Sequence, residues 1–123
     1  MRVFISGPYG DHNPKEVIAE NVRKADKVAR DLMAAGHLVY CPHTMSHGWE
    51  DDSRLTRERY LELDFSFLRF WAEGICRIPG ESVGADAEMR EATRLGLKWV
   101  DMPDVGQTNT QGPGDSIAGG IGG

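Results

Sequence analysis

Three features that would point directly to a partner are missing from this sequence: an excess of basic residues, a long apolar run, and a framework of cysteines. Its 14 lysines and arginines are outnumbered by 19 aspartates and glutamates, which gives a formal net charge of −5. Binding to a nucleic-acid polymer depends on clustered positive charge, so we expect no such partner. No apolar stretch approaches the roughly 20 residues that span a bilayer, so we expect no membrane association either.

Cysteine is scarce, since the chain contains only Cys41 and Cys76. Both lie in or beside short apolar runs, which predicts reduced core thiols rather than disulfides. The apolar run after Arg2 is too short for a signal peptide. These observations favour a cytoplasmic protein, and 123 residues are enough for one domain with a single core. His43 and His47 follow Cys41 without completing a zinc-binding pattern, so we expect no metal and no cofactor.

Four short apolar runs alternate with segments of helical periodicity. The apolar runs occupy residues 3–5, 37–41, 74–78 and 97–100. This alternation predicts an α/β fold: a Rossmann-like or flavodoxin-like parallel sheet of about four to five strands with helices on both faces. The first helix should have Asn13 as its N-cap and Pro14 at its first position, with Glu16 completing a capping box.

The composition of the chain changes after Pro103. Residues 104–123 are rich in glycine and small polar residues, so we expect a flexible tail there and a catalytic domain over residues 1–103. Within the domain, the polar stretch 43–54 predicts a long loop that acts as a substrate lid. Ligands of parallel sheets bind beyond the carboxyl ends of the strands, where this loop should lie.

Two carboxylates interrupt apolar helix faces. Glu88 falls inside the apolar stripe of a helix predicted over residues 83–95, and Asp64 falls inside that of a helix predicted over residues 55–72. Each has an ordinary alternative, since Glu88 can reach an arginine or water and Asp64 can brace a neighbouring loop. Together they indicate an apolar cavity with paired acids, an arrangement used to cleave glycosidic bonds.

Two glycine-containing turns complete the candidate site. The loop containing Gly7, Tyr9 and Gly10 follows the first strand, and its backbone N–H groups can approach an anion or a sugar. Ser82 precedes the Glu88 helix, and Gly84 leaves room for a ligand beside its first N–H groups. The alternatives are an ordinary strand-to-helix turn for the first and a simple helix cap for Ser82.

These residues together resemble the nucleoside 2-deoxyribosyltransferase superfamily. The resemblance rests on Ile5-Ser6-Gly7-Pro8, on Asp64, and on Ser82-x-Gly84-x-x-x-Glu88, and it covers about residues 1–102. The superfamily includes transferases that exchange bases on deoxyribose and hydrolases that cleave nucleoside 5'-monophosphates.

The resemblance implies a role for each matching residue. Glu88 is implied to attack the anomeric carbon, Asp64 to assist the leaving base, and Ser82 to hold a 5'-phosphate. The implied substrate is a small nucleoside or nucleotide. The residues expected to bind it are Ser6, Gly7, Tyr9, Gly10, His43, Ser82 and Gly84.

The sequence departs from the superfamily at Phe4, where relatives carry a tyrosine whose hydroxyl touches the nucleophile. Tyr9 or Tyr60 is then the candidate replacement. The alternatives to an enzyme are a non-catalytic nucleotide-binding module and a domain that cleaves or senses NAD-like nucleotides. We also expect a homodimer or higher homo-oligomer, because Leu63 and Phe70 widen the apolar face of the Asp64 helix.

Overall fold

The computed structural model describes residues 1–10 and 13–103. Its sheet contains four parallel strands in the order β2-β1-β3-β4. The strands are β1 (Arg2–Ser6), β2 (Leu38–Tyr40), β3 (Gly74–Arg77) and β4 (Lys98–Trp99). The predicted α/β class is confirmed, and the strand count in the described part of the chain is at the lower end of the expected range.

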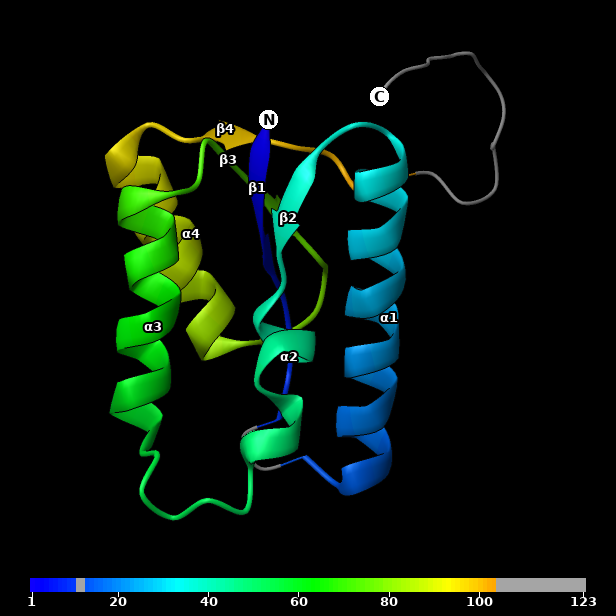
Figure 1. The fold of residues 1–123 in the computed structure, drawn as a ribbon, viewed down its shortest axis with the longest axis vertical. Helices are drawn as coiled ribbons and strands as arrows, with labels where there is room; N and C mark the ends of the chain where they lie inside the picture. The colour runs from blue at the N-terminus through cyan, green and yellow to red at the C-terminus, as the bar shows by residue number, and fades with distance from the viewer. Residues whose placement is uncertain (11–12, 104–123) are drawn as a thin grey trace.

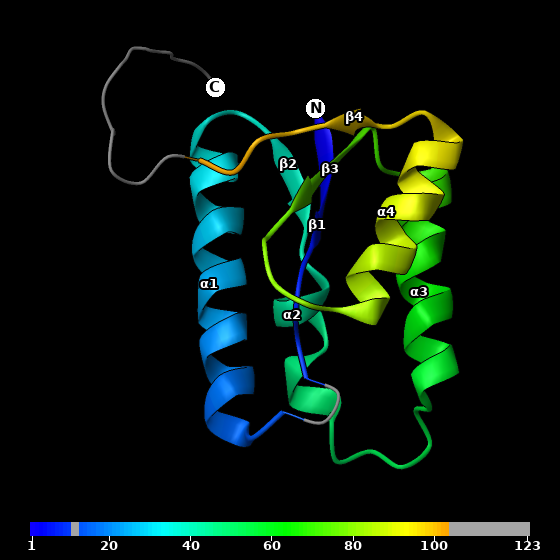
Figure 2. The same cartoon turned by 180° about the vertical axis from the view of Figure 1, so that it is seen from behind.

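The three long helices cover both faces of the sheet (Figure 1). Helix α1 (Lys15–Ala34) lies on one face, and α3 (Arg57–Phe70) and α4 (Val83–Leu95) lie side by side on the other. The view from behind shows the same division (Figure 2). This placement follows from right-handed crossovers, because the chain moves in one direction from β1 to β2 and in the opposite direction from β2, past β1, to β3 and β4.

Alternation along β1 divides its side chains between two cores. Val3 and Ile5 pack into the cluster beneath α1, whereas Phe4 belongs to the cluster beneath α3 and α4. All three are fully buried. Successive strand residues face opposite sides of a sheet, so Ser6 points to the same side as Phe4. That side is the one from which α4 approaches.

The ends of α4 agree with the sequence. The Ser82 Oγ accepts a hydrogen bond from the Ala85 N–H at 3.1 Å, and Gly96 ends the helix with φ 74°. The start of α1 was predicted wrongly, because Pro14 itself is the N-cap and no side chain caps the helix. The Asn13 N–H instead donates to the Gly10 carbonyl at 3.0 Å, so the expected capping box is not formed.

The sequence predicted one long loop over residues 43–54, and this prediction was wrong. The stretch contains α2 (Pro42–Met45) and the 3-10 helix η1 (His47–Trp49), and Pro42 starts the first of these where its missing N–H is harmless. Both turns lie beyond the carboxyl end of β2 (Figure 1). The predicted tail at 104–123 lies outside the described residues. No helix in the described ranges is both long and apolar enough to cross a bilayer.

Candidate active site

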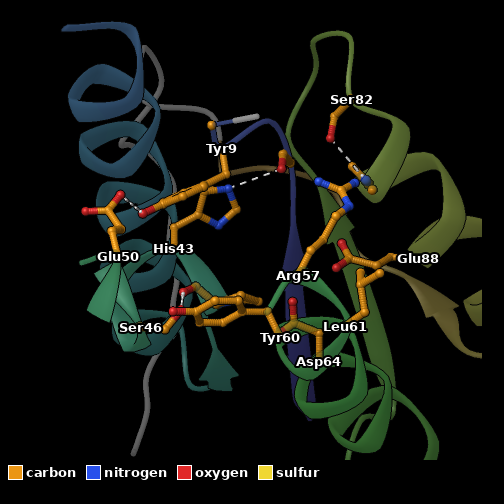
Figure 3. A pocket seen from close by; sticks show the side chains of 15 residues that line it. Tyr9, His43, Ser46, Glu50, Arg57, Tyr60, Leu61, Asp64, Ser82 and Glu88 are labelled. Carbon is orange, nitrogen blue, oxygen red and sulfur yellow. Dashed lines mark hydrogen bonds between the residues drawn. The ribbon is translucent and has the colours of Figure 1, made fainter. Parts of the chain in front are cut away.

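A pocket of about 370 Å³ lies beyond the carboxyl ends of the strands (Figure 3). Its volume is in the range of small-molecule sites. Its walls come from the loop after β1, the turns after β2, helix α3 and the start of α4. The residues expected from the sequence that line it are Gly7, Tyr9, Gly10, His43, Asp64, Ser82, Gly84 and Glu88.

Glu88 projects from the buried side of α4 with only 7% of its surface exposed. The Ser6 hydroxyl donates to its Oε1 at 2.7 Å. Burial raises the pKa of Glu88 to about 8, and the bond from Ser6 opposes that rise. Ser6 is itself fully buried and lies behind Glu88, so it contacts the carboxyl group rather than forming part of the pocket wall.

Asp64 enters the same pocket from α3. Burial raises its pKa to about 7, and the Tyr40 hydroxyl donates to its Oδ1 at 3.4 Å. Figure 3 shows the carboxyl groups of Asp64 and Glu88 pointing into one space. The negative charge of Asp64 further raises the pKa of Glu88. The pair therefore keeps at least one proton near neutral pH, where two isolated carboxyl groups would both be ionised.

Tyr40 was not predicted as part of the site. Its ring stacks on Phe67 with centroids 3.7 Å apart, and the Phe4 ring lies 5.6 Å away at a tilt. Burial and the nearby Asp64 raise the pKa of Tyr40 well above its usual range, so the phenol stays neutral and can donate. Within an apolar run the residue looked like an ordinary core position, and only its register opposite Phe4 reveals which face it occupies.

Neither Tyr9 nor Tyr60 replaces the missing hydroxyl at Phe4, contrary to the sequence-based expectation. The Tyr9 hydroxyl donates to Glu50 and lies 3.1 Å from the Nδ1 of His47. The Tyr60 hydroxyl donates to the carbonyl of Trp49. The hydroxyl that holds Glu88 comes from Ser6, two residues beyond Phe4 on the same side of β1.

His43 fixes the loop that follows β1. It is 4% exposed, and its Nε2 lies 3.2 Å from the carbonyl of Gly7 and 2.9 Å from that of Pro8. Two acceptors require an N–H at Nε2, and burial lowers the pKa of His43, so the ring is neutral. Gly7 has no room for a side chain, because an added Cβ would lie 2.8 Å from the Cβ of Ile78.

The start of α4 is suited to an anion. Ser82 and Gly84 line the pocket there, and a Cβ added at Gly84 would meet no atom within 4 Å. Arg57, the first residue of α3, also lines the pocket, and Figure 3 shows its guanidinium extending toward Ser82. A positive charge and helix N–H groups together favour a negatively charged ligand. Arg57 was not predicted from the sequence, since its position at a helix start was its only signal.

The fold and the pocket together define a parallel α/β domain with a cavity of small-molecule size, into which the buried Glu88 and the half-buried Asp64 project. Among the described residues, no three His, Cys, Asp or Glu side chains gather as metal ligands. The chain belongs to the family described as Domain of unknown function (DUF7768), which it matches over residues 1–102. A search of curated proteins finds no match.

Proposed function

We propose that this protein cleaves the N-glycosidic bond of a nucleoside 5'-monophosphate, or of the corresponding nucleoside. The observation that carries the proposal is the pair Glu88 and Asp64, two acids with raised pKa values in one largely apolar pocket. The resemblance to the nucleoside 2-deoxyribosyltransferase superfamily supports the same reaction. The free buried thiols Cys41 and Cys76 fit the cytoplasmic location expected for it.

In the proposed reaction Glu88 is the nucleophile. Its carboxylate attacks the anomeric carbon as the bond to the base breaks, and Asp64 delivers a proton to the departing base. The ionised form of Glu88 is favoured by the short bond from Ser6, whereas the longer bond from Tyr40 stabilises an ionised Asp64 less. The reaction needs the retained proton on Asp64, whereas burial gives Glu88 the higher pKa, about 8 against about 7. The reactive form is therefore the minor one in the empty pocket, and the bond from Ser6 lowers the free energy needed to reach it.

The glycosyl-enzyme is then resolved by an acceptor. Asp64, now ionised, removes a proton from water, and the activated water releases the sugar from Glu88. A second base in place of water would give transfer instead of hydrolysis. Both outcomes retain the configuration at the anomeric carbon, because each involves two displacements.

The 5'-phosphate is assigned to the start of α4. Ser82 and the open backbone at Gly84 supply hydrogen-bond donors, and Arg57 supplies a positive charge on the opposite wall. Hydrogen bonds to a charged group contribute about 1 to 3 kcal/mol, so a nucleotide should bind better than its nucleoside.

The test is product analysis. Purified protein is incubated with a panel of nucleosides and 5'-monophosphates, with and without an added acceptor base, and the mixtures are separated by chromatography. We expect free base and sugar phosphate from the wild type and neither from Glu88→Gln. Binding without turnover by the wild type would favour a non-catalytic nucleotide-binding module, and release of nicotinamide from NAD would favour the NAD-cleaving alternative.

A further inference from the structure

Each acid in the pocket has its own hydroxyl donor, and the two donors come from neighbouring strands. Ser6 ends β1 and donates to Glu88, and Tyr40 ends β2 and donates to Asp64. The proposed reaction uses Glu88, Asp64 and the bond from Ser6. It assigns no specific task to the hydroxyl of Tyr40 beyond a weak effect on charge.

Tyr40 lies behind Asp64 rather than in the pocket wall. It is 8% exposed and is absent from the residues that line the cavity. Its ring stacks on the Phe67 ring and also contacts the tilted Phe4 ring. A phenol held in this way has little freedom to turn, so its hydroxyl offers Asp64 a hydrogen bond from a fixed direction.

The bond from Tyr40 distinguishes the two oxygens of Asp64. Because Oδ1 accepts from the phenol, Oδ2 is the oxygen that remains to carry a proton. Figure 3 shows the Asp64 carboxyl group directed into the cavity, where the leaving base would lie. A carboxyl group without this partner could rotate and present either oxygen in either orientation.

We propose that Tyr40 is a positioning residue that holds Asp64 with its protonated oxygen facing the leaving base. The proposal rests on the function proposed above. In this assignment the Tyr40 hydroxyl of β2 orients Asp64, the proton donor, whereas the Ser6 hydroxyl of β1 bonds to Glu88, the nucleophile. Tyr40 itself touches no substrate.

The variant Tyr40→Phe isolates the hydroxyl, because the phenylalanine ring preserves the stack on Phe67. Two substrates are compared: the 5'-monophosphate that the wild type cleaves fastest, and a 2-deoxyribose 5-phosphate glycoside of 4-nitrophenol. The nitrophenolate departs as an anion and needs little protonation. We expect kcat for the nucleotide to fall about tenfold or more with KM nearly unchanged, and the nitrophenyl glycoside to be cleaved at close to the wild-type rate.

Asp64→Asn supplies the matched comparison. If Tyr40 acts only through Asp64, adding Tyr40→Phe to Asp64→Asn causes no further loss for the nucleotide. Three results would overturn the role of Tyr40 and leave the proposed function intact. In the double variant, the fold-losses in kcat of the two single variants could multiply. In Tyr40→Phe, kcat could fall equally for both substrates, or kcat for the nucleotide could stay unchanged. A wild type that cleaves neither substrate would overturn the proposed function and the role of Tyr40 with it.

Discussion

Replacing Glu88 by glutamine should abolish turnover and, by the same change, make the folded protein increasingly more stable than the wild type as the pH rises above about 5. The substitution keeps the size of the side chain and an oxygen to accept from Ser6. It removes the charge that burial disfavours. Loss of a covalent nucleophile should lower kcat by a factor on the order of 10⁴ to 10⁶.

The stability change follows from the raised pKa. In the unfolded chain Glu88 ionises near its ordinary value of 4.5, whereas the folded protein holds its proton up to about pH 8. Between these values the folded state binds more protons, so stability falls as pH rises and levels off above about pH 8. At roughly 1.4 kcal/mol for each pKa unit, the loss reaches about 3 kcal/mol at pH 7 and about 5 kcal/mol above pH 8.

Chemical denaturation of the wild type and Glu88→Gln at pH 5, 6, 7 and 8 measures this difference. The wild type should lose stability relative to the variant across the series, with the widest gap at pH 8. Asp64 is present in both proteins, so much of its own titration cancels. Parallel stability curves would refute the raised pKa of Glu88, and near-normal turnover by the variant with any substrate would refute its role as nucleophile.

Five further substitutions test the remaining features. Asp64→Asn should lower kcat at least about 10²-fold without unfolding the protein, and normal turnover would remove it from the site. Ser82→Ala should lower the stability of the fold by about 1 kcal/mol through loss of the helix cap. It should also raise KM for the nucleotide about tenfold and leave the nucleoside nearly unchanged, whereas an equal effect on both substrates would reduce Ser82 to a helix cap. Gly7→Ala should lower the stability of the protein by about 1 to 3 kcal/mol, because the new Cβ would contact Ile78. Gly84→Ala should stabilise α4 by about 0.5 to 1 kcal/mol, because a Cβ there meets open space and alanine favours the helix. Denaturation curves of the two variants measure both changes. Sedimentation at micromolar concentration should show a homodimer that Phe70→Asp dissociates, since Phe70 is 87% exposed, and a wild-type monomer would contradict this.

The two acids and the helix ends of α4 could be predicted from the sequence because their signals are local. Helical periodicity places Glu88 on the buried face of α4, and Ser82 and Gly96 are separated by one helix length. The same reasoning failed at Asn13, because Pro14 is the N-cap of α1. Residue preferences favour asparagine over proline as an N-cap, and they do not show that the Asn13 N–H instead bonds to the Gly10 carbonyl.

The partners of the two acids could not be predicted, because they depend on which strands become neighbours. Ser6 and Glu88 are 82 positions apart, and Tyr40 and Asp64 are 24 apart. Alternation along a strand shows which of its side chains share a face, but not which face of the sheet that is or which helix packs over it. Arg57 was missed for the same reason, since its direction depends on how α3 crosses the sheet.

The central position of β1 also determines when the site can form during folding. Strand β1 pairs with β3, and Ser6 meets Glu88 only after α4 has packed over both. On a growing chain, the first residues of the pocket must therefore wait for nearly the whole domain to be synthesised. Contacts of such long sequence separation also slow folding, because their loop entropy is lost before the contacts form. Recovery of turnover after dilution from denaturant should consequently report the last step of folding rather than an early one.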